Sequence, residues 1–169
     1  NPKGVLYSHR STVLHSFTAC SMDGLQLSSQ DSVLLIVPLF HVNAWGVPYA
    51  SAMCGAKLVL PGPWLDGQSL FNLLRAERCS VSIGVPTVWL GLLKFIEENP
   101  HLISEKLTLE RVLVGGSAAP RALIERLHHI LGVTTIHAWG MSETSPLGTI
   151  GNLLPKHRSL PLDEQITIR

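Results

Sequence analysis

The chain has 169 residues, of which 46% are hydrophobic and 15% are charged, so it can bury one sizeable core and is expected to form one globular unit. Thirteen basic and twelve acidic residues leave a net charge of +1, and the lack of any run of like charge argues against nucleic acid as a partner. Cys20, Cys54 and Cys79 are widely spaced and form no CxxC pair, so we expect buried free thiols in a reducing cytoplasm.

The first sixty residues are predicted to contain two helices and two strands. Ser8 can cap a helix over residues 8–22, in which several apolar residues share one face. The short β-branched run 32–37 is typical of a strand covered on both faces. A helix is expected over 44–54, ended by a glycine, and a second strand over 57–60.

The second half of the chain continues this alternation. Three further helices are expected, starting after Asp66, at Pro86 and at Pro120, because these residues suit the first turn of a helix. The strands between them are expected at 81–83, 111–114 and 133–136. The alternation predicts an α/β fold with a mostly parallel sheet and helices on both faces. Beyond residue 153 the pattern fades into a polar tail.

The segment 32–56 contains no Asp, Glu, Lys or Arg, which by length alone would satisfy a membrane-spanning window. Prolines, glycines and polar residues break this run into short elements, so we expect no membrane span. The first residues contain neither a starting Met nor an apolar signal core, so no targeting segment is visible and the chain is expected to begin inside a longer sequence.

Ligands of open α/β sheets bind at the loops that leave the carboxyl ends of strands. This rule selects the segments 38–46, 84–89, 115–120 and 137–149.

The segment His137–Pro146 combines an indole, a glycine, hydroxyls and a carboxylate directly after a buried strand. An exposed aromatic ring can stack on a nucleobase, hydroxyls can donate to phosphate, and a carboxylate can hold a magnesium ion that bridges phosphates. On this chemistry alone, an ordinary polar loop with Ser142 capping a short turn fits equally well. The segment Gly115–Ala118 lets the backbone approach a flat ligand closely. It lacks the GxSxG spacing of a serine hydrolase and is not a Walker loop.

The order of these motifs resembles the adenylate-forming superfamily, which includes acyl-CoA synthetases, firefly luciferase and peptide-synthetase adenylation domains. Residues 1–10 are similar to the end of that family's phosphate loop, and Phe40–His41, Gly115–Ala118 and Trp139–Thr144 match later motifs in the right order. Four ordered motifs are far more specific than any one of them.

Within that superfamily, the segments 40–46, 84–89 and 137–140 look most like the medium- and long-chain fatty acyl-CoA ligases. The wider family usually has asparagine and tyrosine where this chain has His137 and Trp139, and these departures fit the fatty acyl subgroup.

The resemblance implies roles for the residues of an adenylate site. Trp139 would stack on adenine, Ser142 would touch the α-phosphate and Glu143 would bind Mg²⁺, while His41 would lie beside the reacting carboxylate. Catalysis would thus involve His41, Ser142 and Glu143. The other residues expected to bind ATP or AMP are Lys3, Gly116, Ser117, Ala118, His137 and Gly140.

The resemblance also implies a tunnel for the acyl chain. Trp45 would gate it, and its wall would include Val85, Gly115, Gly140 and Met141. Each role has a plainer alternative: Trp45 and Trp89 could be core aromatics, His41 a hydrogen-bonded histidine, Lys3 a solvated charge and Glu143 a surface acid.

The implied parent is an ATP-dependent fatty acyl-CoA synthetase that uses ATP, Mg²⁺ and coenzyme A, forming an acyl-adenylate before the thioester. Residues 1–169 would be part of its N-terminal AMP-binding domain, without the small C-terminal domain and its catalytic lysine, so the isolated chain is expected to be inactive. An adenylating ligase for an aromatic or short acid, and a catalytically dead lipid- or nucleotide-binding module, stay open as alternatives. A homodimeric parent and peripheral contact with a membrane also stay open.

Overall fold

The structure is built on one six-stranded sheet. The computed structural model describes residue 1 and residues 3–168; Pro2, which belongs to the motif similar to a phosphate loop, and Arg169 lie outside the described residues. The strand order is β2-β1-β3-β4-β5-β6, parallel except for β6, which runs antiparallel to β5. The α/β prediction with a mostly parallel sheet is therefore confirmed. The strands are β1 (Ser32–Leu35), β2 (Lys57–Val59), β3 (Val81–Gly84), β4 (Arg111–Val114), β5 (Thr134–Gly140) and β6 (Leu147–Ile150).

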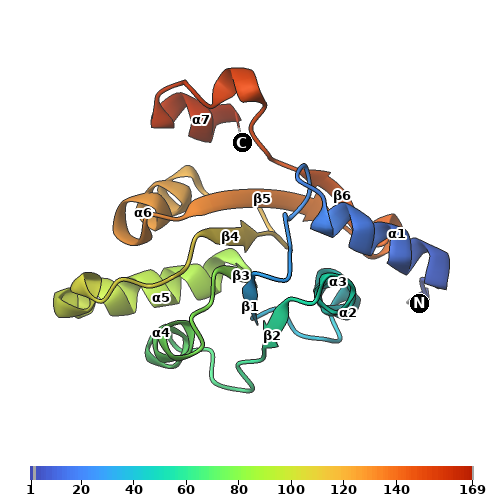
Figure 1. Ribbon diagram of the computed structural model, residues 1–169, viewed down its shortest axis with the longest axis horizontal. Coiled ribbons are helices and arrows are strands. Elements are labelled where there is room, and N and C mark those ends of the chain that lie inside the picture. The colour runs from blue at the N-terminus through green and yellow to red at the C-terminus, as the bar shows by residue number, and fades with distance from the viewer. Residues whose placement is uncertain (2, 169) are drawn as a thin grey trace.

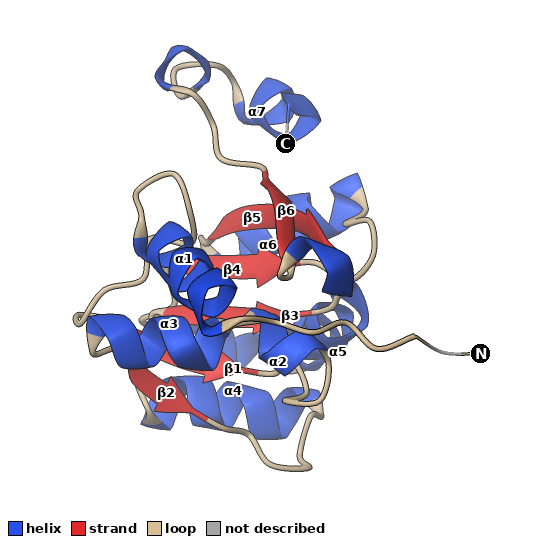
Figure 2. Cartoon of the chain, turned by 90° about the vertical axis from the view of Figure 1, so that its right-hand side faces the viewer, coloured by secondary structure: helices blue, strands red, loops and turns tan. Residues whose placement is uncertain are grey.

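Helices cover both faces of this sheet, as Figures 1 and 2 show. Helices α1, α2 and α3 pack on one face, α4, α5 and α6 pack on the other, and the short α7 contacts α6. The helices are α1 (His9–Cys20), α2 (Val42–Trp45), α3 (Val47–Cys54), α4 (Gly67–Ala76), α5 (Pro86–Glu98), α6 (Arg121–Leu131) and α7 (Leu162–Ile168). Short 3-10 turns lie at Pro100–Ser104, Ser142–Thr144 and Pro155–His157.

Alternating strand residues contribute to two separate cores. In β1, Leu34 packs with α4 and α5, whereas Val33 and Leu35 pack with the α1 and α3 side. In β4, Val112 packs on the α4 and α5 side and Leu113 packs on the α1 and α3 side. Because successive strand side chains point to opposite faces and both faces are covered by helices, β1 and β4 contain uninterrupted apolar runs, at 33–35 and 112–114.

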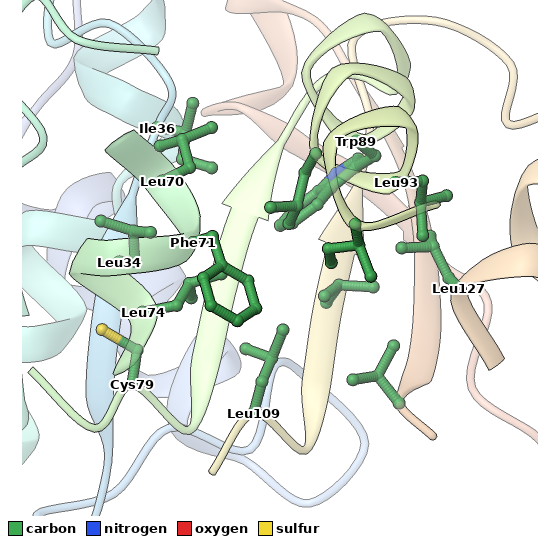
Figure 3. Packing of buried hydrophobic residues seen from close by; sticks show 14 of the residues in the cluster. Leu34, Ile36, Leu70, Phe71, Leu74, Cys79, Trp89, Leu93, Leu109 and Leu127 are labelled. Atoms are coloured by element: carbon green, nitrogen blue, oxygen red, sulfur yellow. The ribbon is translucent and has the colours of Figure 1, made fainter. Parts of the chain in front are cut away.

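The core beneath α4, α5 and α6 contains the large aromatic side chains (Figure 3). Phe71 and Leu74 of α4 and Trp89 and Leu93 of α5 lie against the strands. Trp89 is fully buried, and its indole N–H donates to the carbonyl of Gly84 at 3.2 Å, which satisfies its one polar atom. Trp89 is therefore a core aromatic.

Both predicted side-chain caps are present. The Ser8 hydroxyl accepts a hydrogen bond from the Ser11 N–H at 3.0 Å, and Asp66 Oδ1 accepts one from the Ser69 N–H at 2.9 Å. These are local interactions, so the sequence alone determines where α1 and α4 begin.

Three segments differ from the predictions. The expected helix over 44–54 is divided. The short α2 is part of a left-handed turn over residues 42–46, and the right-handed helix α3 begins only after it. Strand β5 continues through Gly140, four residues beyond its predicted end, and β6 pairs with it. The polar tail beyond residue 153, where the sequence pattern fades, contains α7.

The inward face of α1 also differs from the simplest interpretation of its sequence. Val13, Leu14 and Phe17, which share one face, are 44%, 55% and 62% exposed. The buried residues are His15, Ser16 and Ala19. A polar imidazole thus lies on the face of α1 that packs against the rest of the structure.

A buried ion pair joins the amino ends of the strands. Arg111 Nη2 lies 2.8 Å from Asp31 Oδ1, which also accepts from the Ser80 hydroxyl at 2.8 Å. The other carboxylate oxygen accepts from the N–H and hydroxyl of Ser28 at 2.9 and 3.2 Å. Burial would raise the pKa of Asp31, but the hydrogen bonds from Ser80 and Ser28 and the charge of Arg111 together hold it below its ordinary 3.8.

The three cysteines are free thiols. Cys79 is buried as predicted, whereas Cys20 and Cys54 are half-buried. Burial and the neighbouring thiol of Cys54 raise the pKa of Cys20 to about 11, so it remains a protonated thiol at neutral pH. No helix in the part of the chain that the structure describes is both long enough and apolar enough to cross a membrane.

Candidate active site

A cavity of about 340 Å³ opens at the carboxyl ends of β4 and β5. Three of the four segments selected by the strand-end rule meet there, those over 38–46, 115–120 and 137–149. The buried and half-buried part of the lining includes His15, Leu25, Trp45, Leu113, Ala138 and Leu147, and the polar and more exposed part includes His41, Trp139, Met141, Ser142 and Glu143. An apolar interior with polar groups at its mouth is the usual form of a small-molecule site.

The segment that carries Trp45 has an unusual backbone. Residues 42–46 have φ angles of 53°, 54°, 49°, 55° and 73°. The left-handed conformation costs about 1–2 kcal/mol per non-glycine residue, and a β-branched residue such as Val42 adopts it rarely. Such strain persists only where surrounding contacts hold it, and it is concentrated at functional sites.

The indole of Trp45 lies over the turn Gly115–Gly116. A Cβ on Gly115 would stand 3.0 Å from Trp45 Cη2, so a larger residue would push the indole away. A Cβ on Gly116, whose φ is 77°, would stand 3.1 Å from Cγ1 of Val85. Val85 therefore supports this turn from outside the cavity lining, and the glycines let the indole approach the backbone.

The ring of Trp139 has one packed side and a large exposed surface. It lies against Gly148 of β6, where a Cβ would stand 2.5 Å from Trp139 Cζ3, and 55% of the residue is exposed. Because β5 extends to Gly140, Trp139 is held on a strand and pairs with Thr149 of β6. A rigid aromatic ring with an open face is suited to stacking on a nucleobase.

The turn after β5 is braced around Ser142. The N–H of Met141 donates to Thr144 Oγ1 at 3.0 Å, and the Tyr7 hydroxyl donates to the Ser142 carbonyl at 2.5 Å. Met141, rather than Ser142, is the capping residue of this turn, so the capping alternative for Ser142 is wrong. The Ser142 hydroxyl makes no hydrogen bond within the described chain.

Glu143 and His41 lie at the mouth of the cavity, and both are exposed. Neither side chain forms an ion pair or hydrogen bond with another described residue. Burial raises the pKa of Tyr7, and the nearby negative charge of Glu143 raises it further. A hydroxyl, a carboxylate and an imidazole without protein partners thus surround one opening.

His15 contacts the Trp45 segment from α1. Its Nε2 lies 2.9 Å from the Trp45 carbonyl oxygen, which identifies Nε2 as the protonated nitrogen. Burial lowers the pKa of His15, against the opposing effect of this hydrogen bond. The imidazole is therefore neutral at physiological pH.

Some residues predicted to bind nucleotide lie outside the cavity lining. Lys3 is exposed near the start of the chain, and Ser117 and Ala118 are exposed directly after Gly116. His137 is half-buried on β5, opposite Val114 of β4. The structure therefore groups Trp139, Gly140, Ser142 and Glu143 in the cavity lining, and Lys3, Ser117, Ala118 and His137 are not part of that lining.

Several lining residues were not anticipated from the sequence. Leu113, Ala138 and Leu147 are strand residues whose apolar character indicates only burial. Leu25 follows α1 in a loop held by Asn152, whose side chain donates to the carbonyls of Asp23 and Gly24 at 2.8 and 2.9 Å. The sequence signal for this closely packed loop was the adjacent glycine, Gly24, since a Cβ there would stand 1.8 Å from the Thr18 carbonyl oxygen.

The residues at the mouth fit a nucleotide-bound magnesium ion. The described residues contain no group of three or more His, Cys, Asp or Glu side chains that could enclose a metal. Mg²⁺ in phosphoryl-transfer sites needs no such cage, because one or two carboxylates, phosphate oxygens and water complete its shell. The unpaired carboxylate of Glu143 beside the Ser142 hydroxyl meets that requirement.

Comparison with known proteins identifies the family of this chain. The model of the AMP-binding enzyme family matches residues 1–165. This chain belongs to the AMP-binding enzyme family.

Relatives in this family include several CoA ligases. The chain is 55% identical to a medium-chain-fatty-acid–CoA ligase of Ectopseudomonas oleovorans and 48% identical to a long-chain-fatty-acid–CoA ligase of Thermus thermophilus. It is 51% identical to a 3-methylmercaptopropionyl-CoA ligase of Ruegeria lacuscaerulensis. These matches cover 99–100% of this chain but only 30%, 30% and 31% of the respective relatives, so the chain corresponds to about one third of such an enzyme.

Solved structures show the same fold. A long-chain-fatty-acid-CoA ligase from Archaeoglobus fulgidus matches 94% of this chain with a TM-score of 0.77 at 21% identity, and the match covers 32% of that chain. A benzoate CoA ligase from Burkholderia xenovorans matches 89% of this chain with a TM-score of 0.78 at 20% identity, covering 30% of that chain. The helix and strand arrangement is thus that of adenylate-forming CoA ligases.

Proposed function

We propose that the whole protein carrying this chain is an ATP-dependent fatty acyl-CoA ligase. The observation that carries the proposal is the joining of two surfaces in one cavity. A polar mouth contains Trp139, Ser142 and Glu143, and the apolar part of the lining includes Trp45, Leu113 and Leu147. The first surface suits an adenylate and the second suits a hydrocarbon chain.

In the first half-reaction, a fatty carboxylate attacks the α-phosphate of ATP and pyrophosphate leaves. Trp139 would hold the adenine by stacking, and the Ser142 hydroxyl would donate to an α-phosphate oxygen as negative charge increases there. Glu143 would hold a magnesium ion that neutralises phosphate charge when bound. His41, at the same opening, would donate a hydrogen bond to the attacking carboxylate.

In the second half-reaction, the thiol of coenzyme A attacks the acyl carbonyl of the adenylate and AMP leaves. The chain's contribution to this step is to keep the acyl group in place, because the interior of the cavity is apolar. Burial contributes about 0.8 kcal/mol per methylene group, so the depth of the cavity would determine the preferred chain length. Free thiols in the structure agree with a reaction in the reducing cytoplasm.

A second candidate is a CoA ligase for a short carboxylic acid. It is favoured by the 51% identity to a relative named as a 3-methylmercaptopropionyl-CoA ligase. The two candidates share the adenylate site and differ only in what fills the interior of the cavity.

The test is pyrophosphate release by the whole protein with ATP, Mg²⁺, coenzyme A and a series of straight-chain acids from acetate to palmitate. The proposal expects kcat/KM to rise steeply with chain length to a maximum at a medium or long chain. A maximum at four carbons or fewer would favour the short-acid candidate, and no turnover with any acid would refute both.

We also expect the 169 residues to be inactive in isolation, because they span about a third of the relatives' length. The same assay on the isolated chain checks this. Turnover with palmitate above the background without protein would contradict it.

A further inference from the structure

A buried histidine on α1 meets the strained segment next to the cavity. His15 is 9% exposed and contributes its imidazole to the lining of the cavity. Its Nε2 donates to the Trp45 carbonyl at 2.9 Å. It also packs on Gly46, where a Cβ would stand 2.3 Å from His15 Cδ2. The ring therefore contacts the last two residues of the left-handed run.

These two contacts explain how the run is maintained. The residues before Gly46 have positive φ angles without being glycine, so their conformation depends on external support. Within the described chain, His15 supplies the side-chain hydrogen bond to this segment. On the opposite side, the indole of Trp45 lies over Gly115. The Trp45 residue is thus held between α1 and the end of β4.

His15 also separates two hollows of the molecule. Together with Leu147, it lines the main cavity and a second, more open groove between α1 and β6. The rest of that groove is mostly polar and includes Ser11, Thr18, Asp23, Thr144, Ser145 and Thr149. Removing the imidazole would take away part of the wall between the main cavity and this polar groove. The position of one side chain thus affects both the orientation of Trp45 and the closure of the cavity toward the groove.

We propose that His15 is a positioning residue that fixes Trp45 over Gly115 and closes the main cavity toward the polar groove, and so keeps the acyl chain in an apolar space. This inference rests on the proposed acyl-CoA ligase function. The imidazole hydrogen-bonds to the Trp45 carbonyl and forms part of the wall of the cavity, so its effect acts through Trp45 and through this wall.

The first test compares His15→Ala with His15→Gln in the whole protein. His15→Ala leaves the Trp45 carbonyl without its donor, so we expect KM for the best wild-type acid to rise about tenfold while kcat stays within about threefold. The loss should be largest for the best wild-type acid and small for acetate, because only a long chain depends on burial in the apolar interior. His15→Gln keeps an N–H donor and some volume, and should restore KM to within about threefold of wild type.

Ile96→Val serves as the matched control. Ile96 is 1% exposed in the core on the opposite face of the sheet, so its truncation lowers stability without contacting Trp45. Its chain-length profile should equal that of wild type. An equal loss of kcat for every chain length in His15→Ala, with no change in preference, would overturn the proposal and indicate a structural role only.

A second measurement separates this inference from the proposed function. If the wild-type protein turns over none of the acids, the proposed function fails, and a crystal structure of the His15→Ala protein then decides the positioning role. The expected result is that residues 42–46 leave the left-handed conformation and the indole leaves Gly115. An unchanged Trp45 conformation would contradict the role assigned to His15.

Discussion

The polar side chains at the two ends of the parallel strands differ in their hydrogen bonding and ion pairing. At the amino ends, the Asp31 carboxylate accepts hydrogen bonds from Ser28 and Ser80 and pairs with Arg111. At the carboxyl ends, Ser142 and Glu143 have no side-chain partner within the described chain.

The backbone differs in the same direction. Residues 42–46, beside the cavity, have five successive positive φ angles, whereas at the amino ends of the strands only the separate residues Gln26 and Arg78 have one. Backbone strain lowers stability, so it is retained where a functional site uses it. The comparison indicates that the amino ends hold the sheet together and that the carboxyl ends bind the ligand.

The largest expected effect is on stability, at the amino ends. Arg111→Met would leave the Asp31 carboxylate, 7% exposed, without its cationic partner. Breaking a buried pair by removing one member costs about 3–5 kcal/mol. Urea unfolding of the whole protein should show this loss, with kcat per folded molecule unchanged. A decrease of less than 1 kcal/mol in the free energy of unfolding would contradict the stabilising role assigned to the amino ends of the strands.

The next effect should appear in catalysis alone. Glu143→Gln removes the charge proposed to hold magnesium, and we expect kcat/KM to fall about 100-fold, equivalent to about 2.7 kcal/mol. The midpoint of urea unfolding should stay at the wild-type value, because the exposed carboxylate forms no ion pair or hydrogen bond with another described residue. Unchanged pyrophosphate release would show that the mouth of the cavity is not the adenylate site.

Tyr7→Phe should have a smaller effect, on nucleotide binding. The variant loses the hydrogen bond to the Ser142 carbonyl, which is worth about 1 kcal/mol. We expect KM for ATP to rise about fivefold with little change in KM for the acid. An equal change in both values would mean that Tyr7 supports the whole domain and not the turn at Ser142.

The smallest expected effect is on the stability of the protein at acidic pH. The pKa of Asp31 is below 3.8 in the folded protein, so its stabilising charge is fully present above that pH and is lost as the pH falls through the folded pKa. Wild type should therefore lose stability more steeply than Asp31→Asn below about pH 4. Parallel pH profiles of the urea midpoint would show that the carboxylate is not selectively stabilised.

Local signals in the sequence explain the successful part of the fold prediction. Ser8 and Asp66 cap helices through contacts three residues away, and apolar runs mark the strands. The strand order and β6 depend on contacts between distant segments. Strand β6 is partly exposed on both faces, so it lacks the apolar signal that marked the others.

The candidate site likewise has a part that local sequence signals predicted and a part that depends on contacts between distant segments. Trp139, Ser142 and Glu143 are close in sequence and were predicted together from their motif. His15 was not, because Val13, Leu14 and Phe17 gave α1 an apolar face that turned out to be exposed. The left-handed turn at Trp45 was missed for a similar reason: nothing in Val42 or Ala44 favours it, and contacts with His15 and Gly115 hold it.

The central claim is that one cavity joins an adenylate site to an acyl site, and a crystal structure of the whole protein with a non-hydrolysable fatty acyl-adenylate analogue tests it most directly. The account predicts adenine against the open face of Trp139, the phosphate mimic within hydrogen-bonding distance of the Ser142 hydroxyl, and the acyl chain beneath Trp45 toward Leu25. An analogue bound elsewhere, with Trp139 and Ser142 uncontacted, would contradict the account.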